Sequence, residues 1–191
     1  MAIRPLYRHQ RVTVMGLGLF GGGTGAARFW RELGSDVVVT DLKDADTLAP
    51  SLRELEGLGC RFVLGEHRDE DFKSRDLVIA NPAVKPDNKY LRLARSGGAQ
   101  VLTEVGLVFR LASGPIIGVT GSNGKSTTTA LLGQMLRAHE RRTLVGGNLG
   151  GSLLGALRRH LPSAPIVLEL SSFQLHYLRR QRVSPTVAVV T

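Results

Sequence analysis

The sequence predicts an α/β protein in which a domain with a doubly wound, parallel β-sheet is followed along the chain by a second α/β domain. Short apolar runs of strand composition alternate with segments of helical periodicity, which is the pattern of βαβ units. Two strands lead directly into glycine-rich turns, at residues 16–21 and 121–124, and a helical segment follows each turn. A small-residue linker, Ala112-Ser113-Gly114-Pro115, predicts the border between a domain of residues 1–113 and one of residues 114–191.

The first strand, residues 11–15, runs into Gly16-Leu17-Gly18-Leu19-Phe20-Gly21. A G-x-G-x-x-G turn between a strand and a helix, here expected at residues 24–33, is typical of Rossmann-like dinucleotide folds. The second strand, residues 36–40, ends at Asp41, where such folds place the acid that contacts the ribose. These residues leave an NAD-dependent oxidoreductase open, although a lone glycine motif is a weak signal.

The alternation continues to the end of the predicted first domain. One strand runs into Asn81-Pro82-Ala83, a loop at a carboxyl end, where ligands bind in open α/β sheets. The expected helices are residues 48–58, 89–95 and 104–111, and the expected strands are residues 61–64, 76–80 and 100–102.

The second glycine-rich turn is the stronger signal. A buried strand, residues 116–120, precedes it, and a helix is expected from Thr127. In this arrangement backbone N–H groups and the positive helix end face an anion, Lys125 adds a movable charge, and Ser126 offers an oxygen to Mg²⁺. The strict phosphate-loop pattern wants glycine where this chain has Val119, so a surface turn that merely contains lysine is the alternative. We predict a P-loop NTPase-like domain whose ATP-binding residues are Thr120, Gly121, Ser122, Asn123, Gly124, Lys125, Ser126 and Thr127.

After that helix the sequence predicts strands at 142–145, 165–168 and 186–190 and a helix at 152–161. The last strand has a buried character. Glu169 follows the strand at 165–168, and it can complete a Mg²⁺ shell with Ser126 or merely cap the next helix. The position beside the phosphate loop favours the metal role. We expect His139, His160 and His176 at the surface, because they lie in or beside basic stretches.

Composition restricts the possible classes of protein. The chain has 191 residues, 42% hydrophobic and 21% charged, as in a soluble globular protein with one large or two small domains. A single cysteine, Cys60, excludes an internal disulfide and suits a reducing cytoplasm. The first residues contain no long apolar core, and no apolar run approaches the ~20 residues of a bilayer crossing. We therefore expect neither a secretory signal nor a membrane span.

The net charge of +9 is concentrated in the second half of the chain. Residues 116–191 hold nine Lys and Arg against two acids, and residues 1–115 hold 16 against 14. A basic excess beside a phosphate loop fits anionic substrates such as nucleotides. Aromatic residues make up only 5% and are not interleaved with the basic ones, so we expect no nucleic-acid partner.

Three blocks resemble one family in order and spacing. Thr120–Thr127 (TGSNGKST) is similar to the ATP loop of Mur ligases and folylpolyglutamate synthetases. Together with Gly146–Gly150 (GGNLG), Leu168–Leu175 (LELSSFQL) and GLGLFG near the start, it resembles the Mur ligases that add D-glutamate. The resemblance implies a cytoplasmic, ATP- and Mg²⁺-dependent ligase of peptidoglycan synthesis, and so a role in cell wall biogenesis, cell shape and cell division. Its small-molecule substrates would be UDP-N-acetylmuramoyl-L-alanine (UDP-MurNAc-L-Ala), glutamate and ATP. ATP would convert the carboxylate of UDP-MurNAc-L-Ala to an acyl phosphate, which then reacts with glutamate. We expect a monomer.

The resemblance also implies roles for individual residues. Lys125 and Glu169 would be catalytic, and Ser126 and Glu169 would bind the metal. Phe20 and the Gly21-Gly22-Gly23 run depart from the family pattern, in which a small hydroxyl residue is common at position 20. The substrate-binding residues would be Leu19, Phe20, Asp41, Leu42, Lys43, Asn81 and Ala83 for the UDP group, and Asn148, Ser171 and Gln174 for the muramoyl-alanine part.

In the family, further metal ligands and an amino-acid-binding domain follow the last strand seen here. We therefore expect this chain to be a partial form of the ligase, with an incomplete second domain and no activity alone. Two other classes stay open from the residues. An NAD-dependent oxidoreductase would use the first loop but leaves the second unexplained, and a non-catalytic nucleotide-binding module would use both.

Overall fold

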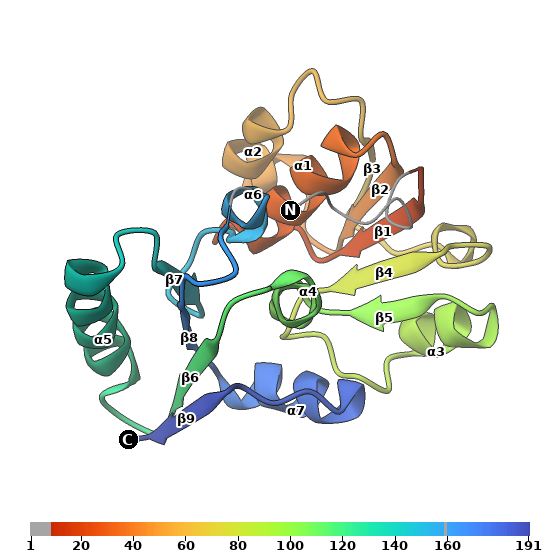
Figure 1. The fold of residues 1–191 in the computed structure, drawn as a ribbon. Coiled ribbons are helices and arrows are strands. Elements are labelled where there is room, and N and C mark those ends of the chain that lie inside the picture. Colours follow the sequence, from red (N-terminus) through yellow and green to blue (C-terminus); the bar gives the residue numbers. More distant parts are fainter. Residues whose placement is uncertain (1–8, 159) are drawn as a thin grey trace. The chain divides into compact units, whose positions relative to one another are not determined.

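Two parallel β-sheets organise the chain in the computed structural model, which describes residues 9–158 and 160–191 (Figure 1). Residues 1–8 of the predicted first domain and Arg159 lie outside the described residues. The described residues form two compact units, which meet in the chain between Glu104 and Val105. This is the start of a helix, nine residues before the predicted border. The extent of the independently folding domains stays a prediction.

The first unit contains a five-stranded sheet in the order β3-β2-β1-β4-β5. The chain moves outward from β1 to β3 and then returns to place β4 on the other side of β1, so the strand order reverses between β1 and β4. The loops after these two strands therefore leave the sheet at its topological switch point, where open α/β sheets bind ligands. The elements are β1 (Arg11–Met15), α1 (Gly22–Glu32), β2 (Asp36–Asp41), α2 (Ala45–Glu54), β3 (Arg61–Leu64), a 3₁₀ turn (Asp69–Asp71), β4 (Leu77–Ala80), α3 (Lys89–Ser96) and β5 (Gln100–Leu102).

The core of this unit follows from strands that are apolar on both faces. Val12, Val14 and Met15 of β1 are buried, as expected of a central strand with helices on both faces. Trp30 from α1 is fully buried. The helix α2 begins three residues earlier than predicted, because the Asp44 side chain accepts the Thr47 N–H at 2.8 Å and caps the helix there.

The second unit contains a four-stranded parallel sheet in the order β7-β8-β6-β9. The helix α5 packs against β6, β7 and β8 (Figure 1). The elements are α4 (Glu104–Leu111), β6 (Ile116–Thr120), α5 (Lys125–His139), β7 (Leu144–Gly147), α6 (Leu154–Leu157), β8 (Ile166–Glu169), α7 (Ser172–Gln181) and β9 (Val187–Val190).

A contact between α4 and α7 explains why α4 belongs with the second unit. A Cβ on Gly106 would lie 2.3 Å from the Gln181 side-chain amide, so the two helices approach closely at this glycine. Judged by these contacts, the predicted linker after α4 therefore lies inside the second unit and not between the two units.

Three details of the second unit differ from the sequence-based expectations. The helix α6 has four residues where ten were predicted, and two glycines with positive φ, Gly150 and Gly151, precede it. The helix α7 was expected only in the alternative in which Glu169 caps the next helix, and it was given no bounds. The strand β9 is mostly exposed, with Val190 78% accessible, because it lies at the sheet edge and pairs only with β6 among the described residues. None of the described helices combines the length and apolarity that a bilayer crossing requires.

Candidate nucleotide-binding sites

The glycine loop after β1 is built on the side chain of Asn81, the residue that follows β4. Gly16 and Gly18 have φ of +87° and +62°, a region that side chains other than glycine rarely adopt. A Cβ on Gly16 would also lie 2.7 Å from the Asn81 Cβ, so there is no room for one. Asn81 in turn accepts the Ala83 N–H at 3.0 Å through Oδ1, which orders its own loop. The structure thus brings the predicted residue Asn81 to the glycine loop, and Ala83 bonds to the Asn81 side chain.

Asp41 closes the other side of this loop. Its Oδ2 accepts the Gly18 N–H at 3.1 Å, and its Oδ1 accepts the Lys43 N–H at 3.0 Å. The residue is 8% exposed. Ser51 from α2 adds a bond from its hydroxyl to the Gly18 carbonyl at 2.7 Å. The carboxylate predicted for a ribose therefore holds two backbone N–H groups, and it fixes the glycine loop to the loop after β2.

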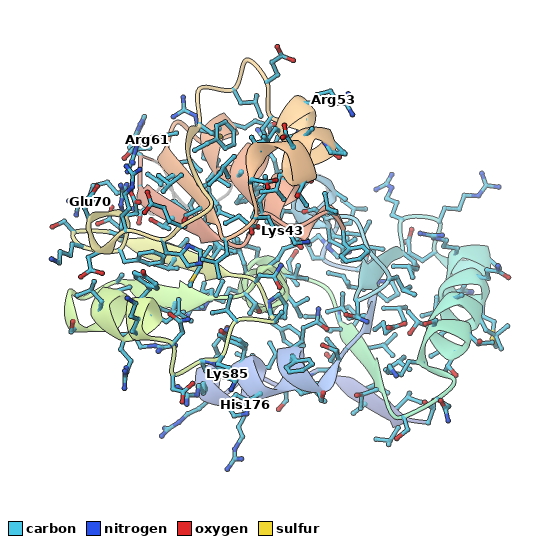
Figure 2. The ribbon with its side chains drawn as sticks, turned by 180° about the vertical axis from the view of Figure 1, so that it is seen from behind. Lys43, Arg53, Arg61, Glu70, Lys85 and His176 are labelled. Atoms are coloured by element: carbon cyan, nitrogen blue, oxygen red, sulfur yellow. The ribbon has the colours of Figure 1, made fainter. Side chains whose placement is uncertain are left out.

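Three apolar side chains are exposed on these two loops. Leu19, Phe20 and Leu42 protrude at the carboxyl edge of the sheet, and Phe20 is 86% accessible. Lys43 and Lys85, labelled in Figure 2, lie on the loops after β2 and β4. Exposed apolar side chains and lysines on the loops at this edge of the sheet suit a ligand with a ring and an anionic group.

His67 is a residue of this region that the sequence analysis missed. Its Nδ1 lies 2.6 Å from the Thr40 hydroxyl, which itself donates to the Glu66 carbonyl at 3.0 Å. Burial lowers the pKa of His67, and the charge of Asp41 partly opposes this effect. No sequence motif surrounds His67, so only the fold could reveal its neighbours.

The phosphate loop lies between β6 and α5 in the second unit. Gly121 and Gly124 have φ of +141° and +79°, which explains both glycines. Among the described residues, the backbone N–H groups of residues 121–124 donate to no protein oxygen. Lys125 Nζ donates to the carbonyls of Gly121 and Ser122 at 2.9 and 3.1 Å. The loop thus offers open N–H groups and a cation at a helix N-terminus, which together favour an anion.

Glu169 lies at the end of β8, beside this loop. In the sheet register it is the partner of Val119, two residues before Gly121. It is 3% exposed, and its Oε1 accepts the Asn148 side-chain N–H at 3.0 Å. Its Oε2 is buried and has no hydrogen-bond partner. A buried carboxylate oxygen without a partner is costly, so the residue fits a cation ligand.

The described residues offer few ligands for a cation beside this loop. Ser126, in the first turn of α5, is exposed. No group of three or more His, Cys, Asp and Glu side chains in the described chain could hold a metal by itself. Mg²⁺ is typically bound by one or two protein groups together with substrate phosphates. Ser126 and Glu169 are therefore sufficient as protein ligands only if phosphate oxygens complete the shell.

Three residues predicted for the muramoyl-alanine part lie near the same edge of the sheet. Asn148 follows β7, and its backbone N–H also bonds to the Glu169 carbonyl at 2.9 Å. Ser171 and Gln174 form a capping box at the start of α7, in which Gln174 Oε1 accepts the Ser171 N–H at 2.8 Å. Phe173 between them is exposed, as is Leu149. The predicted substrate contacts of these residues stay predictions, since their side chains here hold Glu169 and the helix.

The comparisons with known proteins cover most of the chain. Residues 10–103 match the Mur ligase MurD-like N-terminal domain, and residues 119–191 match the Mur ligase middle domain. The chain belongs to the Mur ligase family. This confirms the family that the sequence blocks predicted.

Several curated relatives are closely similar. The UDP-N-acetylmuramoylalanine–D-glutamate ligase of Roseiflexus sp. (strain RS-1) is 52% identical over 182 residues, covering 95% of this chain and 39% of the relative. The ligase of the same name from Treponema pallidum (strain Nichols) is 47% identical over 178 residues, covering 92% of this chain and 34% of the relative. The chain thus spans little more than a third of the length of these Mur ligases.

Solved structures agree on the fold. The UDP-N-acetylmuramate:L-alanyl-gamma-D-glutamyl-meso-diaminopimelate ligase from Neisseria meningitides superposes with a TM-score of 0.58 at 21% identity, over 95% of this chain and 60% of that one. A murein peptide ligase from Psychrobacter arcticus 273-4 superposes with a TM-score of 0.53 at 20% identity, over 85% and 38%. The predicted α/β class, a Rossmann-like sheet followed by a P-loop NTPase-like sheet, is confirmed.

Proposed function

We propose that this chain is the UDP-substrate-binding and ATP-binding part of a ligase that joins D-glutamate to UDP-MurNAc-L-Ala. The first unit would bind the UDP group at the glycine loop, and the second unit would bind ATP and Mg²⁺ at the phosphate loop. The observation that supports this most is the buried Glu169 with its unpartnered Oε2, one strand away from a loop with open N–H groups. The similarity to ligases of this name supports the choice of substrates.

The proposed reaction proceeds in two steps. A carboxylate oxygen of UDP-MurNAc-L-Ala bonds to the γ-phosphorus of ATP, and ADP leaves. The amino nitrogen of glutamate then attacks the carbonyl carbon of this acyl phosphate, loses a proton to water, and displaces phosphate. Both steps bring anions together, so the protein must offset negative charge before they can approach.

This chain's own residues would do so at the nucleotide. The N–H groups of residues 121–124 would donate to phosphate oxygens, and Lys125 would turn from its two carbonyls to the phosphates. Lys125 is the sole lysine in residues 116–191, so no other lysine of this segment can replace it. Ser126 and Glu169 would hold Mg²⁺, which supplies positive charge at the phosphates when bound. Asn148 would hold Glu169 in place through Oε1.

The family match favours this proposal over an NAD-dependent oxidoreductase, because residues 10–103 match the Mur ligase MurD-like N-terminal domain. An NAD-dependent oxidoreductase would also leave the phosphate loop after β6 unexplained. We infer that the glycine loop takes a uridine nucleotide between its exposed apolar side chains. We further infer a cytoplasmic, monomeric protein that serves cell wall biogenesis.

Binding measurements on the 191-residue chain test the proposal. Calorimetry should show binding of UDP-MurNAc-L-Ala, no binding of NAD, and weak ATP binding that requires Mg²⁺. Lys125→Ala should remove ATP binding and leave the UDP substrate bound, whereas Lys89→Ala, in the first unit, should change neither. Tight NAD binding without UDP-substrate binding would contradict the proposal. Incubation with both substrates, ATP and Mg²⁺ should release no phosphate in a glutamate-dependent manner, since we expect the activity to need the whole ligase.

A further inference from the structure

Thr191 contacts the phosphate loop from the neighbouring strand. Its backbone N–H donates to the Thr120 carbonyl at 2.9 Å, which continues the pairing of β6 with β9. Its hydroxyl oxygen lies 2.5 Å from the Asn123 carbonyl oxygen and 3.2 Å from that of Thr120. Since a hydroxyl has one proton, Thr191 donates it to the nearer oxygen, that of Asn123. Thr191 therefore bonds to the loop at two separate peptide groups.

The glycine at position 121 shows how closely Thr191 lies against the loop. A Cβ on Gly121 would lie 2.1 Å from the Thr191 carbonyl oxygen and 2.4 Å from its hydroxyl oxygen. Thus Thr191 and the φ of +141° each exclude a side chain at Gly121.

All four carbonyl groups of residues 120–123 have donors. Thr191 bonds to those of Thr120 and Asn123, and Lys125 bonds to those of Gly121 and Ser122. In a planar trans peptide, the carbonyl and the following N–H point in opposite directions. A carbonyl of Asn123 that is held against Thr191 therefore turns the next N–H, that of residue 124, away from β9.

We propose that Thr191 is a positioning residue of the nucleotide site, whose hydroxyl fixes the Asn123–Gly124 peptide so that the Gly124 N–H is aimed at the phosphates of ATP. This inference rests on the proposed function, because it deepens the ATP site. Lys125 must release its two carbonyls when it turns to the phosphates. Thr191 keeps its bonds at that moment, since its backbone N–H bonds to Thr120 directly after the last residue pair of β6 and β9. It thus keeps the loop ordered while ATP binds.

The test compares three forms of the 191-residue chain. Thr191→Val keeps the branched shape without the hydroxyl, and Thr191→Ser keeps the hydroxyl. Backbone ¹⁵N relaxation without nucleotide should show that the order parameter of the Gly124 amide falls toward the flexible range, about 0.6 or below, in Thr191→Val. The Kd for Mg²⁺–ATP should rise about 3- to 10-fold, as for one lost hydrogen bond. Thr191→Ser should match the wild type in both.

The possible outcomes separate this inference from the proposed function. Equal order parameters and equal Kd values in Thr191→Val and the wild type overturn the inference and leave the ATP site standing. A wild-type chain that binds no ATP overturns the proposed function, while the order parameter, which needs no nucleotide, still decides whether Thr191 positions the loop. Thr191→Ala, which also lacks the hydroxyl, should repeat the result of Thr191→Val, and a wild-type result for Thr191→Ala overturns the inference.

Discussion

Replacing Glu169 by glutamine should make the metal-free protein more stable and its nucleotide site weaker. The wild-type carboxylate has one buried oxygen without a partner, and glutamine puts a neutral group in the same space. Asn148 can still donate to the remaining side-chain oxygen, so that bond is kept. A buried charge without compensation costs more than an unpaired neutral amide.

The expected size of the effect follows from this difference. An unsatisfied buried polar group costs about 1–3 kcal/mol, and more when it is charged. Removing the charge should therefore raise the free energy of unfolding of the second unit by about 1 kcal/mol or more. For a unit of this size, that corresponds to a rise in thermal midpoint of about 4 °C or more. The same variant should lose the Mg²⁺ dependence of ATP binding, because its neutral amide is a poor cation ligand.

Differential scanning calorimetry with and without Mg²⁺–ATP measures both effects. Glu140→Gln is the matched control, since Glu140 is the only other acid in residues 116–191 and bonds through Oε1 to the Arg142 N–H at the surface. The control should change neither the midpoint nor the Mg²⁺ dependence. A lower midpoint for Glu169→Gln in metal-free buffer would refute the reasoning, because it would mean that the carboxylate is already compensated.

Three further predictions concern other parts of the chain. Asp41→Ala should weaken UDP-substrate binding in calorimetry at least 10-fold, because it frees the glycine loop, and unchanged binding would contradict the loop-holding role. Gly23→Ala should destabilise the first unit by about 1–3 kcal/mol in urea unfolding, since its Cβ would lie 2.2 Å from the Leu17 carbonyl oxygen. The control Gly22→Ala meets only the end of a flexible glutamate side chain, so it should lower the free energy of unfolding by less. Burial lowers the pKa of His160, so the unfolded chain binds the proton more readily than the folded one. Stability should therefore fall as the pH drops below about 6.5. His160→Gln should flatten this part of the pH–stability curve, and an unchanged slope would refute the role of His160.

The parts of the fold that the sequence predicted well are those whose signals are local. The strand at 61–64 and the helix at 104–111 have the predicted bounds, because apolar period and flanking residues identify them without their neighbours. The start of the helix α7 was missed, although Ser171 and Gln174 form a capping box that the sequence spells as S-x-x-Q. Those residues had been assigned to a ligand instead of a helix start.

Other errors come from contacts between distant residues. The prediction that His160 lies at the surface was wrong, since it is buried and its ring lies 3.1 Å from where a Cβ on Gly114 would be. Nothing near His160 in the sequence signals a partner 46 positions away. The placement of Thr191 against the phosphate loop is hidden for the same reason, because it depends on β9 pairing with β6.

The hydrogen-bond partners of Asp41 and Glu169 distinguish two residues that look alike in the sequence. Each is an acid at the carboxyl end of a parallel strand beside a glycine-rich loop, so the pattern predicts a ligand contact for both. In the structure both are nearly buried, but their oxygens differ. Asp41 uses one oxygen for each of two backbone N–H groups, which makes it part of the frame that shapes its loop. Glu169 uses one oxygen for Asn148 and leaves the other buried and unpaired, and only this second arrangement leaves the protein with an energetic reason to bind a cation.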